Sequence, residues 1–421
     1  MSARSLSLQR RPRAATVVPP GAFACATFLI GTFFLRSSSL PTGFSGQHMF
    51  LACCVSLVAT VGYLVANWKL EVSPVCVAFL LLTLPSIRAA ADTQDAALRW
   101  VGWCMIVAAI GPLFVNELKV KLLVLNGTRR VLLFCALGSL LINLAGIRLT
   151  GRGMFFGLMG HTMILAPVCA LAALDLFCTL KQKRSRLGIL LLIACCVTCV
   201  GTGSRGAVAG LGFGILTHVA HRRQGIMVIA ATLSALVAVS YVHSTDDEGQ
   251  SVGKDLSSGL YSEIASKGTN DTRGELWAAR LHEFASSPVI GVGFQQQTVF
   301  RRDADENSLE PGSSYLAILS MTGIVGGIGF LLLMAPLGAG LLRRASTIPS
   351  EYRDLLRGWA AFFSLHLVVE GYIYASGSLL CFLFWLTIGC TAALEYQGRR
   401  LQLRQRTILR SRQSRKLERA A

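Results

Sequence analysis

Apolar runs of about 15–25 residues recur along the whole chain, and each is close to the length that a helix needs to cross a bilayer core. This repetition constrains the fold more than any other feature. The 421 residues are 53% hydrophobic and only 15% charged, which is far from the composition of a soluble domain. A closed β-barrel would show short alternating segments instead, and none are visible. The sequence therefore predicts an all-α, polytopic membrane protein.

The runs predict about twelve transmembrane helices, the ninth of them at 225–242. The N-terminal segment resembles a signal peptide, but no small-residue cleavage site follows it, so it is interpreted as a retained first span. The predicted organisation is a basic cytoplasmic N-terminus at 1–20, a bundle of about nine spans at 21–242, a large extracytoplasmic loop at 243–313, three further spans at 314–395 and a basic cytoplasmic tail at 396–421.

The net charge of +18 is spread in short clusters between the apolar runs and at both termini. Such clusters are typical of cytoplasmic loops that also attract anionic lipid, which argues against nucleic acid as a partner. With the N-terminus in the cytoplasm, the loops after even-numbered spans are the basic ones, including the loop with Lys119 and Lys121. Both termini are then cytoplasmic. All thirteen cysteines lie in apolar segments, so neither a disulfide framework nor a metal site is predicted.

The segment 243–313 is the main hydrophilic element, because it carries twelve of the twenty-two acidic residues and six of the forty basic ones. Thr272 followed by Glu275 matches a capping box, and Trp277, Leu281 and Phe284 follow at helical spacing. These residues predict an amphipathic helix near 272–287 that lies against the membrane domain. The following PVIGVGF is expected to return the chain in an extended, glycine-jointed form.

Several arginines are predicted on the outward face, where the positive-inside rule disfavours them. Arg205 lies in GTGSRGAVAG, a turn held by Ser204 and glycines, and Arg152 stands beside an earlier span. Arg273 begins the loop helix, and Arg280 follows two turns later on the same face. Guanidinium groups near helix N-termini favour an anion site. The alternative is that these side chains only snorkel to lipid headgroups.

Two further ionisable residues are expected to contribute to the site or to helix packing. His161 is predicted inside the sixth span, where histidine is either functional or hydrogen-bonded to a neighbouring helix. Glu370, near the outer end of the eleventh span, is costly to expose to lipid and should face the bundle or a cavity.

The chain resembles a known family over roughly residues 150–395. TGSRGAVAG, NDTRGELWAARLHEFASSPVIGVGFQQ and SSYLAILSMTGIVGGIGFLLL follow one another around the large loop, with RGMFFGLMGHTMILA at 152–166 and EGYIYASGSLLCFLFWLTIG at 370–389 in support. This combination resembles the O-antigen ligase/polymerase-like family of bacterial envelope proteins, and it includes Trp277 and Tyr315.

The resemblance implies a helical fold of the lipid-linked sugar transferase type, called GT-C-like, in the bacterial inner membrane. It implies transfer of a glycan from undecaprenyl pyrophosphate to an acceptor hydroxyl on the outer face, with inversion and without a metal or other cofactor. Arg205 and Arg273 fall at the positions that the family uses for the pyrophosphate. The resemblance also implies a glycan or lipid acceptor, with chain-length regulator and flippase proteins as further partners.

One departure from the family concerns the catalytic base. Many ligases have a His-Asn pair before the Tyr-Leu of the post-loop span, but Gly312 and Ser313 stand there in this chain. Glu310 is the first candidate for the base and Glu306 the second, although both can equally be ordinary loop acids. The departure disfavours a lipid A-core ligase and favours an exopolysaccharide or O-antigen polymerase, or a ligase-like enzyme for another acceptor. Two other classes stay open, namely a polysaccharide or lipid-linked substrate transporter and a non-catalytic scaffold of an envelope assembly.

Overall fold

The computed structural model describes residues 19–40, 45–67, 70–147, 157–219, 272–294, 312–342 and 348–420. The basic N-terminus, the span expected at 225–242 and the first part of the long loop lie outside these residues. So do Arg152, Glu306 and Glu310. Within the described residues the secondary structure consists of helices with two isolated bridges, Ser38 to Met159 and Val72 to Phe114. The prediction of an all-α protein is confirmed for this part of the chain.

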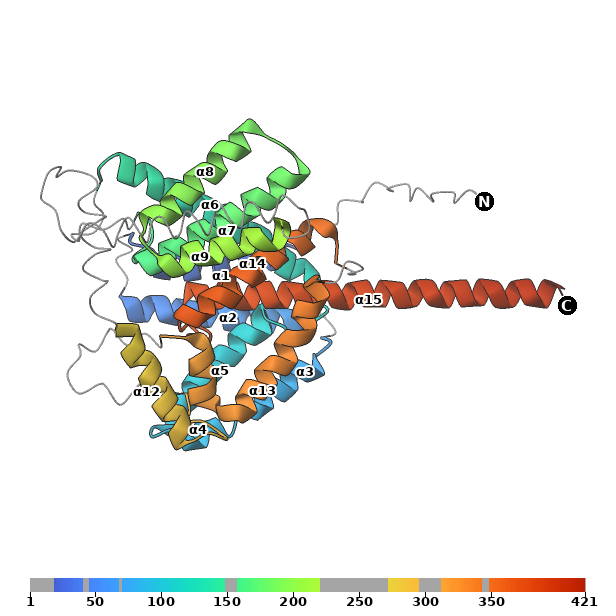
Figure 1. Cartoon of the computed structure of the whole chain (residues 1–421). Coiled ribbons are helices and arrows are strands. Elements are labelled where there is room, and N and C mark those ends of the chain that lie inside the picture. Colours follow the sequence, from blue (N-terminus) through green and yellow to red (C-terminus); the bar gives the residue numbers. More distant parts are fainter. Residues whose placement is uncertain are drawn as a thin grey trace, which may run out of the picture.

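The helices run back and forth through one bundle (Figure 1). In chain order they are α1 (Pro20–Ser37), α2 (Gly46–Asn67), α3 (Pro74–Thr83), α4 (Ser86–Ala89), α5 (Thr93–Ala109), α6 (Leu118–Leu144), α7 (Thr162–Gln182), α8 (Arg186–Gly201), α9 (Arg205–Val219), α12 (Thr272–Ser286), α13 (Ser314–Leu342), α14 (Ser350–Val369) and α15 (Leu379–Ala420).

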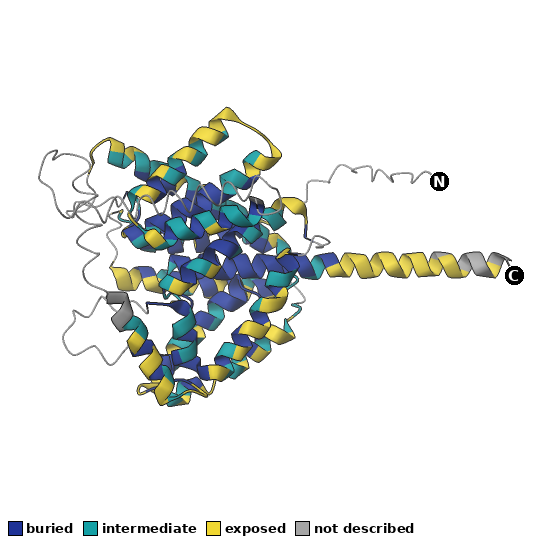
Figure 2. Ribbon diagram, viewed as in Figure 1, coloured by how far each residue is buried: buried dark blue, intermediate teal, exposed yellow. Residues whose placement is uncertain are grey.

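Five of these helices are long and apolar enough to cross a membrane: Pro20–Ser37, Gly46–Asn67, Thr162–Gln182, Ser314–Leu342 and Leu379–Ser411. Buried residues fill the centre of the bundle, and exposed residues lie on its periphery (Figure 2). Many exposed side chains are large and apolar, such as Leu51 and Leu190. A helix surface of this kind suits lipid better than water. The protein is therefore a multi-pass membrane protein, whereas the count of about twelve spans and the GT-C-like type stay predictions.

The bundle has two ends with different character. We call one the head end, where Ser37, Arg205, Ser314 and Glu370 lie at helix termini. There the chain leaving α1 pairs with the chain entering α7, because Gly160 N–H donates to the Ser37 carbonyl at 2.9 Å. At the opposite tail end, α15 continues out of the bundle as an exposed helix with the basic tail (Figure 1 and Figure 2).

Helix α9 is held close to its neighbours by small residues on one face. A methyl group at Gly210 would lie 2.7 Å from the Phe362 ring, and one at Gly214 would lie 3.0 Å from the carbonyl of Gly358. Glycines four residues apart let two helix backbones approach, which is a common packing mode in membranes. This close approach fixes where the first residue of α9, Arg205, lies relative to α14.

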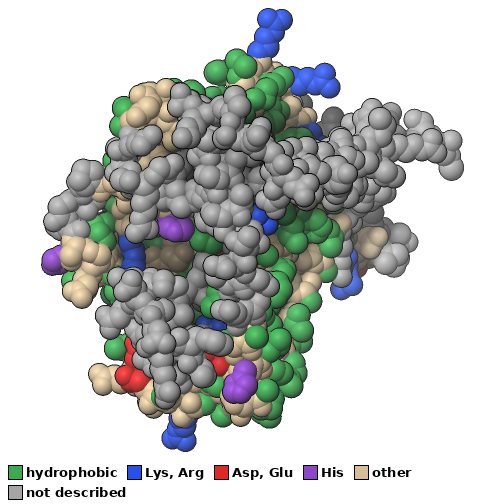
Figure 3. Space-filling view, turned by 60° about the vertical axis from the view of Figure 1, so that its left-hand side comes forward, with side chains coloured by type: hydrophobic (Ala, Val, Ile, Leu, Met, Phe, Trp, Pro, Cys, Tyr) green, Lys and Arg blue, Asp and Glu red, His purple; other side chains and the backbone are tan. Residues whose placement is uncertain are grey.

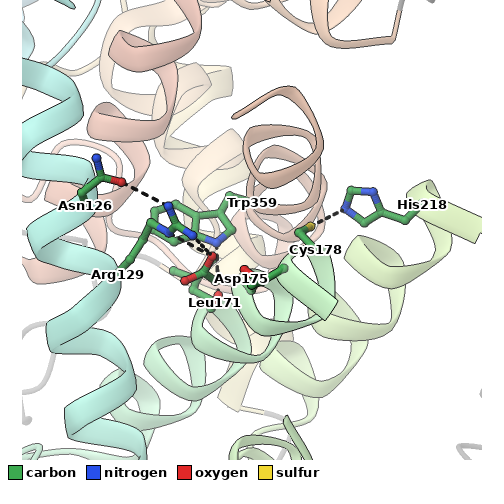
Figure 4. A network of polar contacts seen from close by, with 8 residues as sticks. Asn126, Arg129, Leu171, Asp175, Cys178, His218 and Trp359 are labelled. Carbon is green, nitrogen blue, oxygen red and sulfur yellow. Dashed lines mark hydrogen bonds and ion pairs between the residues drawn. The ribbon is translucent and has the colours of Figure 1, made fainter. Parts of the chain in front are cut away.

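Polar side chains join the helices toward the tail end (Figure 4). The Arg129 guanidinium donates to the Asp175 carboxylate at 2.9 Å from Nε, and Trp359 Nε1 donates to the Leu171 carbonyl at 3.1 Å. Cys178 Sγ and His218 Nε2 lie 3.5 Å apart. These contacts link α6, α7, α9 and α14. Asp175 is therefore paired with Arg129 and has a structural role.

All thirteen cysteines are free thiols.

Lys121 does not lie in a basic cytoplasmic loop as predicted. The sequence places it in a basic cytoplasmic loop, but its side chain is fully buried in α6. Its ammonium group donates to the Gly111 carbonyl at 2.7 Å and to the Phe114 carbonyl. These carbonyls follow the end of α5, where the chain leaves the helix and its acceptors need new donors. The lysine satisfies them, and it therefore contributes nothing to a cytoplasmic surface charge.

The glycine-rich segment after α12 docks onto an interruption in α13. Helix α13 is broken at Gly323, which has φ 64° and ψ −169°. Val292 N–H donates to the Ser320 carbonyl at 2.8 Å, and Ile324 N–H donates to the Pro288 carbonyl at 2.8 Å. Residues 288–290 form a turn where extended chain was expected, and Gly291 has φ 72°. The PVIGVGF segment thus exchanges backbone hydrogen bonds with the broken helix.

We expect Gly323→Ala to destabilise the protein. The left-handed conformation alone costs of the order of 1–3 kcal/mol for a residue with a side chain, and the added methyl group would overlap the Val289 carbonyl group. The measurement is the melting temperature of the purified protein in detergent. Gly338→Ala, in the same helix with open space around its Cα, is the matched control. Equal melting temperatures for the two variants would contradict this account of the interruption.

Candidate functional site

Arg205 begins α9 directly after a tight turn at the head end. Helix α8 ends at Gly201, Gly203 has φ 71°, and Ser204 Oγ accepts a hydrogen bond from Ala207 N–H at 3.5 Å. The Arg205 side chain is exposed, whereas Ala207, two residues on, is fully buried. The first turn of a 15-residue helix has unpaired N–H groups and a partial positive charge. A permanently charged arginine beside it gives this turn the properties of an anion site.

The start of α9 lies against the last turn of α14. A methyl group at Gly206 would lie 2.6 Å from Val369 Cγ2 and 3.7 Å from the His366 ring. Val369 is followed by Glu370, the C-cap of α14, which is 3% exposed. The expectation that Glu370 lies at the end of a helix and is buried in the bundle is therefore confirmed. The structure places Arg205 and Glu370 on neighbouring helix ends.

A buried polar cluster lies where the end of α14 meets the start of α13. Ser314 Oγ donates to the Glu370 carbonyl at 2.7 Å and accepts from Tyr372 N–H at 3.0 Å. The Tyr372 hydroxyl and His366 Nδ1 are 3.0 Å apart. Tyr315 follows Ser314 in α13, and its hydroxyl donates to the Ser364 carbonyl of α14 at 3.0 Å. The cluster holds the start of α13 against the end of α14 beside Arg205.

His366 and Tyr372 were missed by sequence reasoning. The available signal was a histidine one turn before Glu370 on the same helix, in HLVVEGY. Their contact depends on the chain turning back after α14, which no local pattern shows. His366 is 1% exposed, so it cannot touch a substrate in this arrangement. It supports the position of the residues around it.

The predicted place of His161 was wrong. It is the N-cap of α7, with Nδ1 accepting from Met163 N–H at 3.1 Å, and it is exposed. The helix begins only at Thr162, because Gly160 N–H donates to the carbonyl of Ser37, the last residue of α1, and the Leu158 carbonyl accepts from Ser39 N–H. Hydropathy does not reveal this pairing, since the flanking residues are apolar. His161 belongs to the head end but not to the interior of a span.

Arg280 also differs from its prediction. It does not present a free guanidinium beside Arg273, because its side chain is buried and donates to Glu283 at 2.8 Å and to Ser320 Oγ at 3.4 Å. Trp277 Nε1 donates to the Gly312 carbonyl at 3.2 Å. Arg280 thus attaches α12 to α13, and Trp277 attaches α12 to the chain just before α13. Arg273 lies in the first turn of α12, and its side chain is outside the described part.

The described residues of the head end form a mixed surface. In Figure 3, which turns this side of the molecule forward, their Lys, Arg and His side chains stand separately among hydrophobic and other atoms. Within the described residues, no group of three or more His, Cys, Asp or Glu could hold a metal ion. The arrangement suits electrostatic binding of an anion by arginine and helix N–H groups.

These features define a multi-pass helical membrane protein with a cationic turn at one end of its bundle. Comparison with known families finds a match over part of the chain. Residues 189–331 match the family model of O-antigen ligase, a stretch that runs from α8 into α13 and includes both Arg205 and Arg273. The match confirms the resemblance to the O-antigen ligase/polymerase-like family and supports glycan transfer of that general type. No curated protein matches the chain.

Proposed function

We propose that the protein transfers a glycan from an undecaprenyl-pyrophosphate donor to an acceptor hydroxyl at the outer face of the bacterial inner membrane. It would act as an O-antigen or exopolysaccharide polymerase or as a ligase, with both termini in the cytoplasm and the head end outward. The observation that carries the proposal is an exposed arginine at a serine-capped helix start within the stretch that matches the O-antigen ligase model.

The chemistry of the leaving group explains the choice of arginine. The bond from the anomeric carbon to the pyrophosphate oxygen breaks, a bond to the acceptor oxygen forms on the opposite face, and the acceptor proton passes to a base. Negative charge then grows on the departing pyrophosphate. Arg205 and Arg273 would offset this charge through bidentate hydrogen bonds without a metal ion. The N–H groups of the first turn of α9 would contribute to the same field.

Glu310 stays our candidate for the base, with Glu306 second. A carboxylate can accept the acceptor proton if it lies within hydrogen-bond reach. We expect Glu310→Gln to lower glycan transfer by about 10²–10⁴-fold, because general base catalysis contributes that much. The measurement is the rate of transfer by the purified protein, with Asp303→Asn as control from the same loop. Full activity of Glu310→Gln would exclude this role for Glu310.

Chemical analysis of surface glycans in a deletion strain tests the function itself. Accumulation of unattached lipid-linked polymer would indicate a ligase, and accumulation of single lipid-linked repeat units would indicate a polymerase. Either result, reversed by the wild-type protein, supports the proposal. Surface and lipid-linked glycans identical to those of the parent strain would contradict it.

A further inference from the structure

A second arginine lies in an unusual setting at the head end. Arg36 is in the last turn of α1, a candidate membrane span, next to exposed Leu35. Its guanidinium carbon lies 4.7 Å from the centre of the Phe50 ring, and Phe50 is itself 41% exposed. A cation over an aromatic face is stabilised there while the ring stays in contact with lipid. Because a helix that crosses a bilayer ends near the lipid headgroups, the last turn of α1 places Arg36 where lipid phosphates are expected.

The Arg36 guanidinium also lies against Gly377. A methyl group at Gly377 would overlap Arg36 Nη1, so the absence of a side chain at this position makes room for the guanidinium. Nη1 is buried, and none of the described residues accepts a hydrogen bond from it. The Cys53 thiol also interacts with the guanidinium, but a thiol is only a weak acceptor. A buried charged donor without a strong acceptor is costly. Among the described residues, the Arg36 guanidinium therefore lacks an anionic partner.

The position of Arg36 at the C-terminus of α1 explains only part of its surroundings. A cation in the last turn of a helix is stabilised by the helix dipole, but this stabilisation needs neither the Phe50 ring nor the space at Gly377. We propose that Arg36, between Phe50 and Gly377, forms a second lipid-phosphate site at the head end. Its ligand is the phosphate or pyrophosphate of a polyprenyl-linked substrate or the headgroup of an anionic phospholipid, since both present the same oxygens at this depth.

The segment 369–377 connects the Arg36 site with the turn that contains Arg205. Val369 lies against Gly206 at one end of the segment, and Gly377 lies against Arg36 at the other. Between them the chain is held by hydrogen bonds of Ala375 N–H to Tyr372 O at 3.0 Å and of Ser378 N–H to Ala375 O at 2.8 Å. A glycan transferase must bind both a donor and an acceptor. That Arg36 binds one of these two substrates rests on the proposed function.

Binding to the full-length protein in detergent tests the site. Native mass spectrometry measures the affinity for farnesyl pyrophosphate and, separately, for dioleoyl phosphatidylglycerol. We expect Arg36→Ala to weaken binding of at least one lipid about tenfold or more, as for loss of a charge-assisted hydrogen bond. Gly377→Ala should act in the same direction, because it displaces a flexible side chain and not backbone. Arg99→Ala, which removes an arginine bonded to Asp95 at 2.7 Å on nearby α5, is the control.

The two lipids separate the sources of the phosphate. Loss confined to farnesyl pyrophosphate assigns the site to a substrate, and loss with phosphatidylglycerol assigns it to bulk lipid. Wild-type affinity of Arg36→Ala for both lipids would overturn the proposal. Arg205→Ala measured in parallel keeps the two proposals apart. If Arg205→Ala weakens binding of farnesyl pyrophosphate while Arg36→Ala binds both lipids as the wild type does, the Arg36 site fails and the proposed function stands. If Arg36→Ala weakens binding of farnesyl pyrophosphate and Arg205→Ala does not, the result counts against the pyrophosphate role of Arg205.

Discussion

Cells whose only copy of the protein carries Arg205→Ala are expected to lose polymerised or ligated surface glycan, at a normal level of membrane-inserted protein. Removal of one preorganised group that stabilises developing charge typically costs about 10²–10³ in rate. Arg205→Lys should fail as well, since a lysine cannot present the planar, bidentate pair of donors that matches phosphate oxygens. The measurement is the glycan profile of cells together with the amount of the variant in the membrane fraction.

The chain contains a matched control for this prediction. Arg186 begins α8 as Arg205 begins α9, is exposed, and follows a serine whose side chain accepts from Gly188 N–H at 3.3 Å. It lies at the tail end, so Arg186→Ala should leave the glycan unchanged. Normal glycan with both Arg205→Ala and Arg205→Lys would rule out the pyrophosphate role.

The second large effect is expected on stability. Arg280→Ala should lower the free energy of unfolding by about 3–5 kcal/mol, because removal of one partner leaves a buried charge uncompensated. The charge left behind is Glu283, which is 5% exposed. The measurement is the melting temperature of the purified protein and the yield of membrane-inserted protein.

A double replacement separates a structural role from a role in the site. Apolar side chains of similar size in place of a buried ion pair are often neutral or stabilising. We therefore expect Arg280→Leu combined with Glu283→Leu to melt well above Arg280→Ala and to retain glycan transfer. Loss of transfer with wild-type melting in Arg280→Ala would show instead that Arg280 acts on the substrate.

The local patterns of the chain predict some elements closely. The capping pattern of Thr272 and Glu275 predicts a loop helix that begins near Thr272, and α12 spans Thr272–Ser286. The GTGSRG turn indicates a cation at a helix start, where α9 begins with Arg205. Both rely on signals within a few residues of one another. Caps, turns and glycine spacing are local, so the sequence carries them directly.

Other features depend on contacts between distant segments. His161 was placed inside a span because hydropathy does not show that Gly160 bonds to the chain after α1. Lys121 looks like a loop charge until the carbonyls of Gly111 and Phe114 surround it. The space for Arg36 depends on Gly377, at the far end of the sequence. Hydropathy and charge counts describe composition along the chain and contain no information on such pairs.

Reconstitution tests the central claim most directly. The purified full-length protein is placed in proteoliposomes with an undecaprenyl-pyrophosphate-linked repeat unit, with and without a lipid acceptor, and the products are identified by mass spectrometry. The account predicts that glycan appears on the second lipid or on the acceptor while undecaprenyl pyrophosphate is released, and that Arg205→Ala abolishes both. A donor that crosses the bilayer intact, or that is not consumed in either mixture, would contradict it.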